Sequence, residues 1–259
     1  MKELIATVAD IQRFSTHDGP GIRTTVFFKG CVLKCAWCHN PECISSEIQT
    51  LEYPEKCIGC QKCHLGCFSG AKVVCGQQMS ENDVLAEILA DKEYYQNGGG
   101  VTFSGGEPLL WRTFLSKMID LCHENGINCA IETSLFIYDE EIFRKCDLVL
   151  ADLKIWSDDL HQKYTGVSNE IIKQNFQKLN ALGVNIVAKT PIIPEIDQEI
   201  EKISEFLKNL DNVQKYELLP YHPLGNSKRE ALGLEKQDFT IPSNELMKEL
   251  GKYEFIRLC

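Results

Sequence analysis

Three cysteines in one short segment are the first residues of the sequence whose types and spacing could carry chemistry. Cys31, Cys35 and Cys38 follow the pattern C-x-x-x-C-x-x-C, which lets three thiolates surround one cuboidal four-iron cluster. Three ligands leave one iron without a protein thiolate, so that iron can bind the amino and carboxylate groups of a small molecule and pass an electron to it. Structural zinc is the alternative, but zinc sites usually take four protein ligands in paired C-x-x-C spacings. The pattern therefore favours a redox cluster with an open iron.

A second cysteine motif lies further along the chain and has the C-x-x-C-x-x-C-x-x-x-C spacing of bacterial ferredoxins. Its members are Cys57, Cys60, Cys63 and Cys67. This spacing predicts a second four-iron cluster, again with zinc as the alternative. Because the motif is separate from the first along the chain, we expect the auxiliary cluster to serve electron input or partner docking rather than the cofactor pocket.

The fourth ligand of this auxiliary cluster is open, because the fourth cysteine of a two-cluster ferredoxin serves the other cluster. Cys67 is the first choice, since it lies four residues beyond Cys63, the separation that also joins Cys31 and Cys35. The competing candidates are Cys43 and Cys75.

Short runs of β-branched and aromatic residues indicate the strands that position these motifs. Six buried strands are predicted at residues 24–28, 101–103, 128–132, 148–152, 185–189 and 215–219. Helices are predicted between them at residues 81–95, 111–125, 170–182 and 198–210, with Gly126 and Gly183 as stop signals. Alternating strands and helices imply a parallel sheet.

Polar or glycine-rich residues follow nearly every predicted strand, and in a β/α barrel the chemistry lies at these carboxyl ends. We therefore predict an α/β fold, an incomplete TIM-like (β/α)6 barrel spanning residues 1–259. Residues 43–78 interrupt the alternation and carry their own cysteine motif, so we expect a small ferredoxin-like insertion there.

Composition limits the class of protein. The formal charge of −10 argues against a general nucleic-acid or anionic-membrane binder, because those partners attract basic surfaces. No segment has the length of a signal peptide's apolar core or of a membrane span, so we expect a cytoplasmic protein and a monomer. Thirteen cysteines in such a chain indicate metal rather than disulfides. Those without ligand spacing are expected to be buried small hydrophobes or, at the terminus, an exposed thiol: Cys122, Cys129, Cys146 and Cys259.

Together these motifs resemble the radical S-adenosylmethionine activating enzymes of glycyl radical enzymes. The resemblance runs from about Val8 to His222. It rests on the three-cysteine motif with its extension Trp37-Cys38-His39-Asn40-Pro41-Glu42, on Ser104-Gly105-Gly106-Glu107-Pro108, and on the string Asp18-Gly19-Pro20-Gly21-Ile22-Arg23.

The resemblance implies a set of cofactor contacts. Cys31, Cys35 and Cys38 would ligate the catalytic cluster. S-adenosylmethionine would meet Trp37 and His39 near its adenine, Gly105, Gly106 and Glu107 at its amino group, Lys154 at its carboxylate, and His222 at its ribose or adenine. Glu132, Thr133 and Asp152 would hold a monovalent cation beside that carboxylate. Two positions depart from the family pattern: Leu135 stands where glycine is usual, and Trp111 where glutamine is common.

The resemblance also implies partners. Asp18, Gly19, Gly21 and Arg23 would receive the loop of a glycyl radical enzyme, although the same residues could simply form a turn. Flavodoxin or ferredoxin would supply the electron. The single-motif insertion favours a hydroxyproline-type dehydratase as the partner over pyruvate formate-lyase. Two alternatives remain: a radical enzyme that acts on a small molecule, and a two-cluster electron carrier without catalysis.

Overall fold

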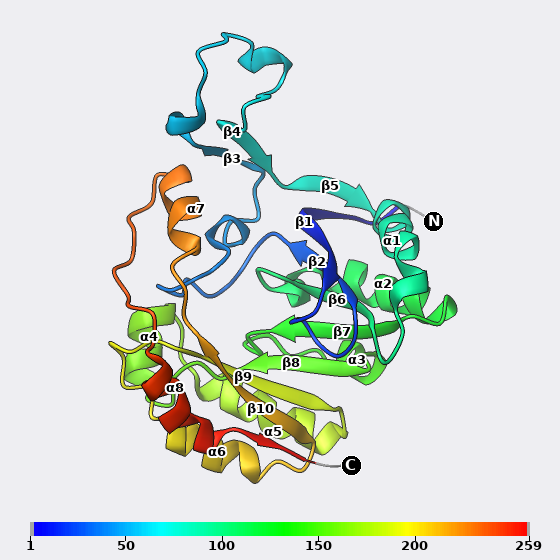
Figure 1. The fold of residues 1–259 in the computed structure, drawn as a ribbon. Helices are drawn as coiled ribbons and strands as arrows, with labels where there is room; N and C mark the ends of the chain where they lie inside the picture. The colour runs from blue at the N-terminus through cyan, green and yellow to red at the C-terminus, as the bar shows by residue number, and fades with distance from the viewer. Residues whose placement is uncertain (1–2, 258–259) are drawn as a thin grey trace.

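A single mixed sheet organises the computed structural model, which describes residues 3–257. Its middle consists of six strands, each parallel to its neighbour in the series: β2 (Arg23–Phe28), β6 (Gly100–Gly105), β7 (Asn128–Thr133), β8 (Leu148–Asp152), β9 (Ile186–Ile192) and β10 (Val213–Pro220). Figure 1 shows these strands following one another around a curve. All six predicted strands are therefore present, in chain order across the sheet.

The barrel is incomplete, because β2 and β10 do not pair with each other. On the free side of β2 lies β1 (Ile5–Ser15), antiparallel to it and itself paired with β5 (Gln77–Ser80). On the free side of β10 lies the short antiparallel β11 (Phe255–Ile256). The strand order is thus β11-β10-β9-β8-β7-β6-β2-β1-β5, an open sheet. The three antiparallel strands were not predicted from the sequence.

The helices flank the sheet, and their ends have local causes. The first, α1 (Glu81–Ala90), begins in a capping box of Ser80 and Asp83 and stops short of the predicted residue 95, where a 3₁₀ turn replaces it. Gly183 follows α5 with φ of +81°, as a left-handed stop requires. The others are α2 (Arg112–Glu124), α3 (Glu140–Lys145), α4 (Asp158–Thr165), α5 (Glu170–Leu182), α6 (Ile200–Lys208), α7 (Gly225–Ala231) and α8 (Asn244–Leu250).

Two buried apolar clusters fix the sheet. The larger involves most strands and includes Phe28, Phe103, Leu115 and Phe176. A smaller one gathers Trp37 with Ile155, Ile193, Ile196 and Tyr221. Because Trp37 belongs to the first cysteine motif, this second cluster ties that loop to the carboxyl ends of the later strands. Among the described residues, no helix is both long and apolar enough to cross a membrane.

The segment with the second cysteine motif leaves the sheet through a separate hairpin. Strands β3 (Gln49–Glu52) and β4 (Lys72–Cys75) pair antiparallel, and the chain between them extends away from the barrel (Figure 1). The hairpin packs on the barrel through Leu51, Cys75 and Ala231 of α7.

Candidate active site

A cavity of about 480 Å³ opens at the carboxyl edge of the parallel strands. Its size lies within the range of small-molecule sites. It brings together most of the residues that the sequence indicated: Asp18, Cys31, Cys35, Trp37, Cys38, His39, Gly105, Gly106, Glu132, Thr133, Asp152, Lys154 and His222. Four of the residues predicted to contact the cofactor or the partner do not line it: Gly19, Gly21, Arg23 and Glu107.

The three cysteines of the first motif share one loop, and backbone bonds hold that loop in place. Cys31 N–H donates to Ile44 O at 2.9 Å, and Ala36 N–H donates to Tyr164 O at 2.9 Å. Burial raises the pKa of Cys31 and of Cys35 to about 12, with the neighbouring thiols contributing to the rise. Three half-buried cysteines that line one cavity fit a cluster with three protein ligands, because a metal binds the thiols as thiolates and removes the cost of desolvating free charge.

The two glycines at the end of β6 are required by backbone packing. A Cβ on Gly106 would lie 2.1 Å from Gly30 O and 2.6 Å from Cys43 O. At Gly105, φ is +105° and a Cβ would lie 2.3 Å from Phe28 N. Any side chain here would push β6 away from the start of the cysteine loop, so the glycines keep the two walls of the cavity together.

Glu107 differs from the expectation that it meets the cofactor. Its side chain is fully buried, and one carboxylate oxygen accepts from Thr133 Oγ1 at 2.8 Å. The other oxygen accepts from Ser134 Oγ at 2.6 Å and from Ser134 N–H at 3.2 Å. Glu107 therefore orients the Thr133-Ser134 turn from behind. The Gly-Gly-Glu motif predicted that Glu107 lies near the cofactor, but it could not predict which way the side chain of Glu107 points.

Two lysine–carboxylate pairs set the charge of the cavity. Lys154 Nζ lies 2.5 Å from Asp152 Oδ2, and Lys189 Nζ lies 2.9 Å from Glu132 Oε1. Burial alone would lower the pKa of Lys154, but Asp152 and the thiol of Cys35 outweigh it and raise the pKa. Burial would likewise raise the pKa of Glu132, and Lys189 reverses the direction. Lys154 and Lys189 are therefore protonated, and Glu132 is ionised, at neutral pH.

Lys189 is a site residue that the sequence reasoning missed. It lies in β9, is almost fully buried and lines the cavity. The sequence did contain a signal for Lys189, since it is a single lysine within an otherwise apolar strand. A buried ammonium group needs a carboxylate partner, so such a lysine indicates a charged site.

Trp37, His39 and His222 form the outer wall of the cavity. The Trp37 ring centroid lies 6.3 Å from that of Tyr164, within the smaller apolar cluster. His39 Nδ1 lies 3.0 Å from His222 Nε2. Burial, then His222 and Lys228, lower the pKa of His39 to about 4. His39 is therefore neutral at pH 7 and can share one proton with His222.

The two departures from the family pattern have structural explanations. Leu135 adopts φ of +58°, is fully buried, and donates its N–H to Thr133 Oγ1 at 2.9 Å. Its burial offsets the strain of a left-handed conformation in a residue with a Cβ. Trp111 Nε1–H donates to Lys29 O at 2.7 Å, which supports the backbone just before the cysteine loop.

The string from Asp18 to Arg23 joins β1 to β2 and turns into the barrel. Asp18 Oδ2 accepts from Ser15 Oγ at 2.5 Å and from Thr25 Oγ1 at 2.7 Å. Arg23 has no exposed surface and donates to Thr102 Oγ1 at 2.7 Å and Val101 O at 2.6 Å. Only Asp18 of the four predicted partner contacts faces the cavity. The Arg23 side chain supports the turn from beneath, because its burial leaves no surface for a partner to touch.

The second motif is open to solvent in this structure. Cys57, Cys60 and Cys63 are exposed, and Cys67 is half-buried. A hydrogen bond with Ser69, followed by backbone N–H groups, lowers the pKa of Cys67. The competing candidates Cys43 and Cys75 are buried near each other at the base of the hairpin, and Cys43 lines the main cavity.

The cysteines without ligand spacing follow the prediction as far as the structure describes them. Three are buried: Cys122, Cys129 and Cys146. Cys259 lies outside the described residues.

Comparison with known proteins identifies the family. Residues 25–207 match the model of the Radical SAM superfamily. The trans-4-hydroxy-L-proline dehydratase activating enzyme of Clostridioides difficile is 37% identical, and the match covers 95% of this chain and 94% of that one. The pyruvate formate-lyase-activating enzyme of Clostridium pasteurianum is 35% identical, and the match covers 96% of this chain and 97% of that one. The chain belongs to the radical SAM activating enzymes of glycyl radical enzymes.

Solved structures agree with this radical SAM assignment. A domain of pyruvate-formate lyase-activating enzyme from Bacteroides vulgatus gives a TM-score of 0.51 at 32% identity, covering 60% of this chain and 92% of that one. SuiB from Streptococcus suis gives 0.59 at 17% identity, covering 86% and 42%, and supports the fold alone. Membership in the superfamily implies S-adenosylmethionine and one four-iron cluster, which the cavity fits.

Proposed function

We propose that this radical SAM enzyme activates a dehydratase of the trans-4-hydroxy-L-proline class. When bound, the catalytic cluster would supply the electron for reductive cleavage of S-adenosylmethionine to methionine and a 5′-deoxyadenosyl group, which would remove a hydrogen atom from a glycine Cα of the partner. The observation that carries the reaction class is the convergence of three half-buried cysteines, two glycines and two lysine–carboxylate pairs on one cavity.

In this proposal the residues of the chain bind and orient the cluster and S-adenosylmethionine, and none of them transfers a proton. Cys31, Cys35 and Cys38 hold the cluster. Lys154 attracts the methionine carboxylate by charge, and the backbone at Gly105 and Gly106 leaves room for the amino group.

A wall of rings holds the adenosine part of the cofactor. Trp37, His39 and His222 line that wall, and the neutral state of His39 suits contact with a neutral adenine. A monovalent cation would use oxygens of Glu132, Thr133 and Asp152. Lys154 pairs with Oδ2 of Asp152, and Glu132 Oε2, which accepts from Ser104 Oγ at 2.6 Å, is not the oxygen that pairs with Lys189.

The second motif would hold an auxiliary four-iron cluster. Cys57, Cys60, Cys63 and Cys67 supply the ligands, and the lowered pKa of Cys67 supports its choice over the buried Cys43 and Cys75. Its distance from the barrel suits electron input from flavodoxin or ferredoxin in the cytoplasm. The enzyme is proposed to work as a monomer.

The reaction class is tested by 5′-deoxyadenosine formation in anaerobically reconstituted enzyme with a chemical reductant. Cys35→Ala should lower the rate at least a thousandfold, because two thiolates cannot hold the open cluster. Cys146→Ala, a buried cysteine away from the cavity, is the matched control and should retain the rate. Wild-type turnover in Cys35→Ala would contradict the assignment of the cavity.

Partner identity is tested separately. The enzyme is incubated with a trans-4-hydroxy-L-proline dehydratase or a pyruvate formate-lyase, and the glycyl radical is counted by electron paramagnetic resonance. A radical only on the dehydratase is expected. A radical only on the lyase would overturn the partner while leaving the reaction class intact.

A further inference from the structure

A second group of metal-ligating side chains lies away from the cavity. His123 is at the end of α2, Cys129 is the second residue of β7, and Asp147 directly precedes β8. One potential ligand atom from each of the three lies within 4.8 Å of the others. The group is at the amino ends of β7 and β8, whereas the cavity uses their carboxyl ends. It therefore does not belong to the site for S-adenosylmethionine.

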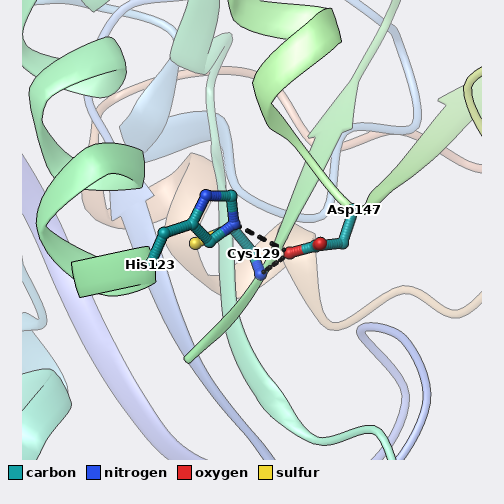
Figure 2. A group of neighbouring side chains, drawn as sticks. All are labelled: His123, Cys129 and Asp147. Carbon is teal, nitrogen blue, oxygen red and sulfur yellow. Dashed lines mark hydrogen bonds and ion pairs between the residues drawn. The ribbon is translucent and has the colours of Figure 1, made fainter. Parts of the chain in front are cut away.

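The three side chains converge from different elements, as Figure 2 shows. His123 Nε2 lies 3.0 Å from Asp147 Oδ2, and the same oxygen accepts from Cys129 N–H at 2.7 Å. The sulfur lies beside the imidazole ring. The side chains of His123 and Asp147 are 38% and 40% exposed, whereas Cys129 is fully buried. An ion could therefore reach the group from solvent and meet the sulfur on its inner side.

A second thiol lies next to this group but outside it. Cys122 precedes His123 in α2 and is fully buried, whereas the Cys129 thiol donates to Ile127 O at 3.6 Å. The sulfur of Cys129, an imidazole nitrogen and a carboxylate oxygen form a mixed donor set that suits a zinc-type ion, which prefers tetrahedral nitrogen and sulfur ligation. Hard cations such as Mg²⁺ prefer oxygen ligands and fit this set poorly.

We propose that His123, Cys129 and Asp147 form a structural site for a divalent zinc-type ion, with a water molecule as the fourth ligand. The ion would join the end of α2 to the starts of β7 and β8. Those two strands carry Glu132 and Asp152 at the cavity. The bound ion would therefore hold the amino ends of both strands in place and take no part in the reaction at their carboxyl ends. The alternative is a plain His123–Asp147 ion pair above packed thiols.

The test uses the holoenzyme, because filled clusters remove the other cysteines from competition. Anaerobically reconstituted protein is incubated with equimolar ZnCl₂ and desalted, and zinc and iron per chain are measured by plasma mass spectrometry. We expect about one retained zinc with no loss of iron. The X-ray absorption spectrum at the zinc edge, which is blind to iron, should show sulfur at about 2.3 Å and nitrogen or oxygen at about 2.0 Å.

Matched variants assign the zinc to these residues. His123→Ala and Cys129→Ser should each lower retained zinc at least tenfold. Their controls are Glu124→Ala, the neighbouring exposed residue, and Cys146→Ser, the buried cysteine that precedes Asp147; both should retain zinc. His123 is at an exposed helix end, so its variant folds even where Cys129→Ser does not.

Three results would overturn the zinc site: no zinc retained by the wild type, zinc retained at the expense of iron, or equal zinc in His123→Ala and Glu124→Ala. None of these results bears on cleavage of S-adenosylmethionine or on partner activation, because the active site lies at the other edge of the sheet.

Discussion

Asp18 is the residue at which partner binding and structural support can be separated. Its carboxylate faces the cavity and also accepts from Ser15 and Thr25 within its own turn. If the turn receives the partner's loop, Asp18→Ala should lower glycyl radical formation at least tenfold more than it lowers uncoupled 5′-deoxyadenosine formation, because the loop is present only when the partner is bound.

The measurement follows both products in one preparation, with Asp18→Asn as the conservative variant. The amide of this variant keeps an acceptor oxygen for the turn, so the variant should restore cofactor cleavage. A parallel fall of both products in Asp18→Ala, with full rescue of both in Asp18→Asn, would show that Asp18 serves the turn alone.

Single residues also show where reading the sequence succeeded and where it stopped. The cysteine spacing predicted that Cys31, Cys35 and Cys38 lie together, and the structure places all three at one cavity, because this spacing is a local property of the chain. Glu107 belongs to a similarly local motif, yet its side chain points away from the cavity, because direction depends on the Thr133-Ser134 turn that the fold brings beside it. Arg23 was misassigned for the same reason: only the fold reveals that it is buried.

At the scale of elements, the contact from Glu107 to the Thr133-Ser134 turn joins the ends of β6 and β7. In Glu107→Gln, the amide nitrogen replaces one acceptor oxygen and leaves at least one buried donor unpaired, at a cost of about 1–3 kcal/mol. We expect a matching fall in the free energy of unfolding and weaker binding of S-adenosylmethionine, since the turn forms part of the cavity wall.

Urea denaturation and equilibrium binding measure these two effects. Glu124→Gln, on the exposed end of α2, is the control and should change neither. Unchanged unfolding and binding in Glu107→Gln would argue against the role of this contact.

The parallel strands were predictable as elements, whereas the edge strands were not. The runs that form β2 and β6 to β9 are buried along most of their length and are rich in β-branched or aromatic residues, whereas β10 is only partly buried. Strand β1 carries consecutive exposed residues, among them Gln12 and Arg13, so it shows no clear alternation of apolar and polar residues. Helices α3 and α4 have 6 and 8 residues, too few to establish a helical period.

At the scale of the whole molecule, the proposal of two clusters predicts about eight irons per chain in anaerobically reconstituted protein. Replacing both Cys57 and Cys60 by Ser should lower this to about four, because the two exposed cysteines hold only the auxiliary cluster. Iron analysis and electron paramagnetic resonance would check the numbers.

The same double variant should still cleave S-adenosylmethionine with dithionite as the reductant, because a small reductant can reach the catalytic cluster directly. With a protein electron donor the rate should fall at least tenfold. Four irons in the wild type, with Cys57 and Cys60 dispensable under both reductants, would remove the auxiliary cluster from the proposal.

The hairpin of β3 and β4 has an evolutionary consequence. Its two strands leave the barrel side by side, with Gln49 paired to Cys75, so the chain between them can lengthen, shorten or be exchanged for another segment without rethreading the barrel. The alignment with the hydroxyproline dehydratase activating enzyme spans 286 positions, more than the 259 residues of this chain, so that relative carries residues that this chain lacks. A hairpin stem of this kind lets a lineage gain or lose inserted residues while the strands of the main sheet keep their order and pairing.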